Sequence, residues 1–140
     1  MKKLYYVVFV LMVSLLLTGF SCERYAKAGQ LAKDFAATAL VAQQLETQAY
    51  NGGYIQPATH LAIQSKFSQL ADAGVRLDQA INQTHNAQGA KAQIDVAASL
   101  LSDLSNNQIT GIKDDKTRLA VQAAIVSCQA ILDNIAAFAQ

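Results

Sequence analysis

The chain has 140 residues, of which 52% are apolar and only 15% are charged, so its length indicates a single domain. The charged share lies well below the roughly 25% of an ordinary soluble domain. Setting aside Lys2 and Lys3 near the start leaves nine basic against ten acidic side chains, which excludes the basic surface that nucleic-acid binding requires.

The chain begins like a segment that directs export. Lys2 and Lys3 supply a short positive start, and an almost uninterrupted apolar run occupies residues 4–20. A basic start, an apolar run and small residues near its end are typical of a secretory signal. The sequence therefore predicts a signal peptide or membrane anchor over residues 1–21 and a helical domain over residues 22–140. The domain is expected in the cell envelope, facing the periplasm or the exterior.

Cys22 follows the apolar run directly and is preceded by the small residue Ser21. This arrangement resembles the lipobox of bacterial lipoproteins, and the resemblance covers about the first 22 residues. It implies that Cys22 becomes the first residue of the mature chain and carries a lipid that holds the protein on the membrane. The sequence departs from the family pattern at Gly19 and Phe20, where the family prefers Leu and a small residue.

Two alternatives to lipidation stay open. Gly19-Phe20-Ser21 and Ala26-Lys27-Ala28 both fit cleavage between small residues, which would release a soluble exported protein. An uncut segment would instead act as an anchor, because a run of about 17 apolar residues reaches the short limit of a membrane span. All three outcomes place the rest of the chain on the same side of the membrane.

Four helices are predicted beyond the leader, at about residues 23–50, 57–85, 88–105 and 113–139, because apolar residues recur there at alternating spacings of three and four. The four expected core stripes are Ala28, Leu31, Phe35, Thr38, Ala42, Leu45 and Ala49; Ile63, Phe67, Leu70, Gly74, Leu77 and Ile81; Ala90, Ile94, Ala97, Leu101 and Leu104; and Val121, Ile125, Cys128, Leu132, Ile135 and Ala139.

Short links between these helices favour antiparallel neighbours. The predicted fold class is therefore all-α, an up-down-up-down four-helix bundle after the N-terminal segment, with a three-helix bundle or an open pair of helical hairpins as alternatives. In the four-helix arrangement the loops at residues 50–57 and 106–112 lie together, at the end far from the membrane.

The candidate chemical groups do not form a catalytic or metal-binding pattern. His60 and His85 lie near opposite ends of one predicted helix, and neither has a histidine or glutamate at the spacing that chelates a metal. Cys128 falls on a core stripe, where a thiol packs as a small hydrophobe. Helical rise separates it from Cys22 by roughly 15–18 Å, too far for a disulfide. We therefore expect no enzyme activity, cofactor or metal.

The far-end loops hold the candidate contact residues Tyr50, Tyr54, Ile55, Ile109 and Ile112. Two interpretations stay open: these side chains close the end of the core, or they form a contact surface, for which tyrosines are well suited.

The functional prediction is a small membrane-anchored lipoprotein that acts as a non-catalytic structural or protein-interaction module. Its expected partners are the membrane and either another envelope protein or a second copy of itself, with self-association supported by glutamine-rich helix faces. The alternative is an exported carrier of a small apolar ligand, because the small residues of the stripes, Gly74 above all, favour a cavity between helices.

Overall fold

The structure, a computed structural model, describes the backbone of residues 2–139 and the side chains of residues 23–139. Four α-helices account for most of the described chain, and no strand occurs in it, so the all-α prediction is confirmed. The elements are α1 (Lys2–Asn51), α2 (Pro57–Asp78), the π-helical turn η1 (Gln79–Gln83), α3 (Ala87–Asp103), the π-helical turn η2 (Leu104–Gln108), the 3-10 turn η3 (Ile109–Gly111) and α4 (Asp115–Phe138).

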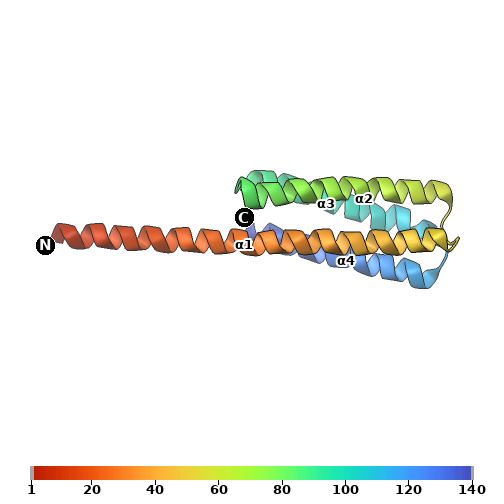
Figure 1. Cartoon of the computed structure of the whole chain (residues 1–140), viewed down its shortest axis with the longest axis horizontal. Helices are drawn as coiled ribbons and strands as arrows, with labels where there is room; N and C mark the ends of the chain where they lie inside the picture. Colours follow the sequence, from red (N-terminus) through yellow and green to blue (C-terminus); the bar gives the residue numbers. More distant parts are fainter. Residues whose placement is uncertain (1, 140) are drawn as a thin grey trace.

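Helix α1 is much longer than the other three. Its backbone runs without a break from the apolar leader into the first predicted helix, although a helix was expected only from residue 23 onward. At 1.5 Å per residue its 50 residues span about 75 Å. The N-terminal part therefore extends well beyond the ends of the other helices (Figure 1).

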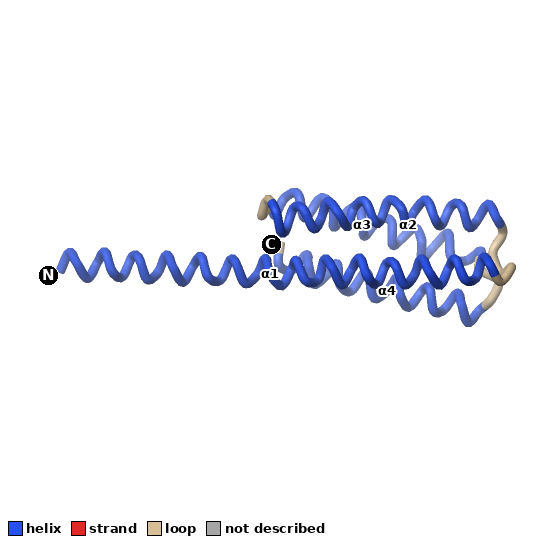
Figure 2. The backbone as a smooth tube through the Cα atoms, in the orientation of Figure 1, coloured by secondary structure: helices blue, strands red, loops and turns tan. Residues whose placement is uncertain are grey.

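The other helices pack around the C-terminal half of α1. Helix α1 contacts both α4 and α2, and α3 contacts both α2 and α4 (Figure 2). At one end, the Tyr25 hydroxyl donates a hydrogen bond of 3.1 Å to the His85 carbonyl in the link before α3. At the other end, the Lys113 amide donates a bond of 2.9 Å to the Tyr54 carbonyl, so the loops before α2 and α4 are joined.

The core matches three of the four predicted stripes. Every stripe residue predicted on α2, η1, α3 and η2 is buried. In the fourth stripe only Ala139, which follows the end of α4, is partly exposed. On α1 every second residue of the predicted stripe is wrong, and in two cases the buried residue is the next one along the chain. Ala32 and Glu46 are buried where Leu31 and Leu45 were expected, and those leucines, like the predicted core residue Thr38, are half-buried instead.

Local signals explain where the helices begin and end. Pro57 occupies the first turn of α2, where its missing N–H costs no hydrogen bond. The side chains of Asn86 and Asp114 cap α3 and α4 by accepting from the amides of Gly89 and Thr117. The second and third helices were predicted to continue regularly to residues 85 and 105, but each finishes in a π-helical turn.

Among residues 23–139, whose side chains the structure describes, α4 is long and apolar enough to cross a membrane by length and composition. One stripe of this helix is nevertheless buried against the rest of the protein: Val121, Ile125, Cys128, Leu132 and Ile135. A core helix meets the same criteria of length and composition, and 28% of the apolar stretch of α4 that meets them is buried within the described protein.

Candidate functional site: the seam between α1 and α2

The contact between α1 and α2 is called here the seam, and a series of side-chain contacts fixes its register. Gly29 lies beside Asn82, Phe35 beside Gly74, and Glu46 beside His60. Residue numbers rise on α1 as they fall on α2, so the two helices run antiparallel. The contacts therefore give the order in which residues of α1 and α2 follow one another along the seam.

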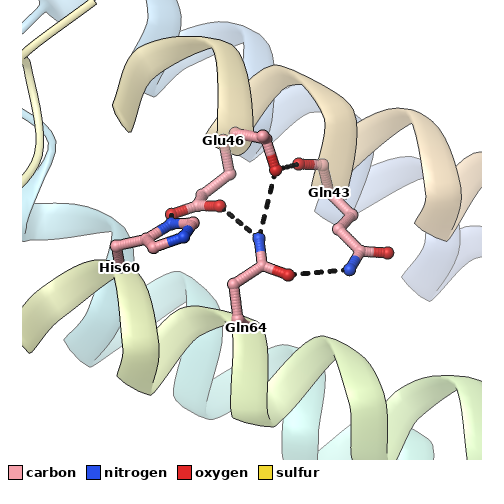
Figure 3. Close-up of polar contacts among 5 residues, drawn as sticks. Gln43, Glu46, His60 and Gln64 are labelled. Atoms are coloured by element: carbon pink, nitrogen blue, oxygen red, sulfur yellow. Dashed lines mark hydrogen bonds and ion pairs between the residues drawn. The ribbon is translucent and has the colours of Figure 1, made fainter. Parts of the chain in front are cut away.

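The half of the seam nearest the 52–56 loop contains a buried carboxylate. The Glu46 side chain is 0% exposed and lies at a core position of α1 between Ala42 and Ala49. His60 Nδ1 lies 2.8 Å from Oε1 of this carboxylate, and Gln64 Nε2 donates to Oε2 at 2.5 Å (Figure 3). A charge buried in this way is tolerated only when it is paired and hydrogen-bonded, and both carboxylate oxygens have a partner here.

His60 and Gln64 are in turn held by further contacts. The His60 ring stacks on Tyr50 of α1, with ring centroids 3.8 Å apart and an angle of 4° between the planes. Gln64 accepts from Gln43 Nε2 at 2.8 Å and donates to Thr47 Oγ1 at 3.2 Å (Figure 3). Among the described side chains, no buried polar atom lacks a hydrogen-bond partner. This network, called here the polar cluster, fixes α1 against α2.

Sequence reasoning missed the polar cluster. It treated His60 only as a residue near one end of a predicted helix with no chelating neighbour, whereas the His60 side chain is only 18% exposed and contacts Glu46. A signal was present, because Glu46 continues the alternating four-three spacing of Ala28, Ala32 and Phe35 along α1. The leucines one position earlier hid this spacing, since a leucine is the ordinary choice for a core position.

The other half of the seam opens into an apolar groove with a volume of about 450 Å³. Its lining is mostly aromatic, aliphatic and small, with polar groups at the two ends: Ala32, Lys33, Phe35, Ala36, Ala39, Leu40, Gln43, Phe67, Leu70, Ala71, Gly74, Val75 and Asp78. The volume falls in the range of roughly 300–1,000 Å³ that small-molecule sites occupy. The cavity expected near Gly74 is thus present, as a groove open to solvent.

The groove has a ridge on each side. Lys33, Ala36 and Leu40 lie at helical spacing on α1, and Ala71, Val75 and Asp78 do so on α2. Leu40 and Val75 are 53% and 58% exposed, which is high for large apolar side chains. Gln43 lines the groove and also bonds to Gln64, so the polar cluster closes one end of the groove. The seam therefore has a locked half and an open half.

The predicted contact residues of the far end differ in how far they are exposed to solvent. Ile55, Ile109 and Ile112 are buried in the core and close its end. Tyr50 is half-buried against His60, and Tyr54 is the exposed member of the set. Tyr54 also lines a second hollow of about 350 Å³, which includes Leu45 on α1 and Lys116 on α4. Only the tyrosines of the predicted set can therefore reach a partner.

The cysteines and His85 are the remaining candidates. Cys22 lies on the α1 backbone, but its side chain is outside the described residues. Cys128 is a buried free thiol, and burial raises its pKa to about 12, so it is a packing group. The His85 ring, in the link between η1 and α3, contacts the Tyr25 ring at an angle of 46° with centroids 4.6 Å apart, and it lies at the other end of the seam from His60. No three His, Cys, Asp or Glu side chains within residues 23–139 gather as a metal site.

Two partly exposed carboxylates have pKa values below their usual 3.8. Hydrogen bonds from Asn107 and Lys66 lower the pKa of Asp103, and bonds from the Thr117 side chain and amide lower that of Asp114. Both carboxylates stabilise helix ends or helix contacts, so their shifts reflect folding and do not indicate a reactive group.

Comparison of the chain with protein-family models, curated proteins and solved structures gives no match in any of the three. The seam and the leader are therefore the features of the chain that bear on its function.

Proposed function

We propose that the protein is a small membrane-anchored envelope lipoprotein that acts as a non-catalytic structural or protein-interaction module. Residues 1–21 are its signal peptide or anchor, Cys22 carries the lipid, and residues 22–140 form an up-down-up-down four-helix bundle that faces the periplasm or exterior. The contacts of Tyr25 with His85 at one end and of Tyr54 with Lys113 at the other support this arrangement of the helices.

The observation that carries the interaction role is the open half of the seam. Leu40 and Val75 project from its two ridges and remain largely exposed above a floor that includes Phe35 and Phe67. Contiguous exposed apolar surface of this kind marks contact sites on soluble proteins. A partner that covered the groove would remove these ridges from water, which is the main source of affinity in association.

Two measurements test this function. The intact mass of the chain extracted from membranes should show a start at Cys22 with added acyl mass, and Cys22→Ala should abolish both. A photo-crosslinking residue at Val75 should then yield an adduct of defined mass in the membrane, as should one at Tyr54 if the far end also makes contact. The matched control is Leu119 on α4, which is 62% exposed and lies outside the groove. If neither position crosslinks more than Leu119 does, the interaction role is wrong.

A second candidate function is an exported carrier of a small apolar ligand, and the groove beside Gly74 supports it. The volume of about 450 Å³ would accommodate one small molecule along the apolar floor. Native mass spectrometry of the extracted chain should then show a bound molecule, and Ala71→Leu should reduce its amount by filling the groove. A chain that carries no small molecule before or after this change would eliminate the carrier.

A further inference from the structure

We infer that a second copy of this chain covers the groove. The two chains run parallel to each other and are in contact through the same face, the one that contains the groove. This inference rests on the proposed function, because anchoring in one membrane makes the two chains run in the same direction. It names the partner that the proposed interaction role leaves open.

The register of the seam provides the first argument. Gly29 lies opposite Asn82. Phe35 lies opposite Gly74, inside the groove. Toward the polar cluster the ridge residues therefore follow in the order Lys33, Ala36 and Leu40 on α1, and Asp78, Val75 and Ala71 on α2. A two-fold axis parallel to the helices preserves heights, so each residue of α1 meets the same level of α2 in the other copy.

Size complementarity is the second argument. Along this order the sizes of the apolar ridge residues are opposite on the two helices: Ala36 precedes Leu40 on α1, whereas Val75 precedes Ala71 on α2. In a two-fold pair the α1 ridge of each copy lies against the α2 ridge of the other, so large side chains meet small ones and the two grooves face each other. Small residues at such positions allow helices to approach closely, as interlocking ridges and grooves require.

Charge complementarity is the third argument, and it favours a copy over an apolar small molecule. Lys33 and Asp78 stand on opposite ridges at the leader-proximal end of the groove. Among the described ion pairs neither residue takes part, and the Asp78 carboxylate only accepts a hydrogen bond from Asn82 at 2.6 Å. In the two-fold pair Lys33 of each copy faces Asp78 of the other, which gives two ion pairs.

The resulting contact has a familiar form. The α1 helix of each copy would lie between its own α2 and the α2 of the other copy, antiparallel to both. Four helices that alternate in direction around an apolar centre make the packing of a four-helix bundle. The centre of this intermolecular bundle would be the two grooves, with their phenylalanine floors covered.

Mixing two charge-reversed chains tests the inference. Lys33→Glu alone places two pairs of negative charges in the contact, and Asp78→Lys alone places two pairs of positive charges there. Either change should raise the dissociation constant of the full-length chain in detergent about tenfold. When the two variants are mixed, one Glu–Lys pair and one native Lys–Asp pair form, so the mixed dimer should bind as tightly as the native dimer. Differently tagged chains and sedimentation or pull-down measure this.

Two controls complete the experiment. Lys91→Glu reverses a charge on α3, within an exposed ion pair with Asp95, and should leave the dissociation constant unchanged. Leu40→Gln should weaken the dimer, whereas Leu119→Gln should not. A monomeric native chain, or a mixture that binds no better than either variant alone, would overturn the inference. The proposed function fails separately, if the native chain is found outside the membrane fraction, and the detergent assay does not depend on that result.

Discussion

The polar cluster gives the sharpest prediction about stability, through the change His60→Leu. This substitution removes the partner of Oε1 of Glu46, a carboxylate that is 0% exposed, and leaves Gln64 as its remaining donor. Removing one member of a buried pair typically costs about 3–5 kcal/mol. Because His60 is 18% exposed, water can reach part of the vacated space, so we expect the lower end, about 3 kcal/mol, and a fall in Tm of roughly 10 °C.

A double-mutant cycle with Glu46→Leu identifies the cause. If the loss comes from an uncompensated buried charge, Glu46→Leu together with His60→Leu should be more stable than His60→Leu alone, by about 2 kcal/mol. Urea unfolding followed by circular dichroism measures all four chains. Glu23→Gln is the control, because Glu23 belongs to an exposed pair with Lys27 and its loss should not change the midpoint measurably. Additive losses at residues 46 and 60 would refute the reasoning.

Three further predictions concern single residues. Gly74→Ala should stabilise the protein by roughly 0.5–1 kcal/mol in thermal unfolding, because the new Cβ would sit 3.7 Å from the Phe35 ring, an ordinary contact, and alanine favours a helix. Cys128, whose pKa is raised to about 12, should resist thiol reagents at pH 8 until denaturant is added; rapid labelling of the native chain would show that it is accessible. Asp103 and Asp114 have lowered pKa values in the folded state, so the stability they provide is complete above pH 3.8 and is lost as the pH falls through their folded pKa values. In Asp114→Asn the free energy of unfolding should therefore fall less steeply as the pH is lowered.

The sequence predicted the helices well wherever one apolar stripe dominated. On α2, α3 and α4 the three-four spacing identified the buried positions, because each of these helices presents one clear apolar face. On α1 two stripes compete, one through Leu31 and Leu45 and the other through Ala32 and Glu46. The structure places the smaller alanines and Glu46 inward.

The reason lies in the two neighbours of α1. This helix packs between α2 and α4, so its side chains divide between two contacts. Leu45 turns toward α4, where it lines a hollow with Lys116 and Ala120. The position between the two contacts, occupied by Glu46, faces the centre. Only knowledge of which helices flank α1 would reveal this, and periodicity within one helix does not contain it.

The helix ends were harder to predict than the helices. The π-helical turns after α2 and α3 depend on where the chain must turn back, and the residues within them, such as Asn82 and Asn107, are neutral in local preference. The far-end isoleucines looked available for binding because they lie in loops. Ile109 and Ile112 are buried because the joined loops close the core there, which the sequence favours but does not require.

The division of the seam into two halves connects stability with the proposed association. The polar cluster holds α1 and α2 together at the half near the 52–56 loop, so the leader-proximal half does not need a filled groove to keep these helices paired. A chain selected only to fold as a monomer would gain from larger side chains at Ala36 and Ala71, whose exposed positions on the ridges would bury apolar surface over the groove. In the proposed dimer these small residues instead lie against the ridges of the second copy, which carry Val75 and Leu40. Ala36→Leu and Ala71→Leu should therefore leave unfolding of the monomer unchanged or improved while they weaken the dimer, and an equal loss in both measurements would show that the groove serves the monomer alone.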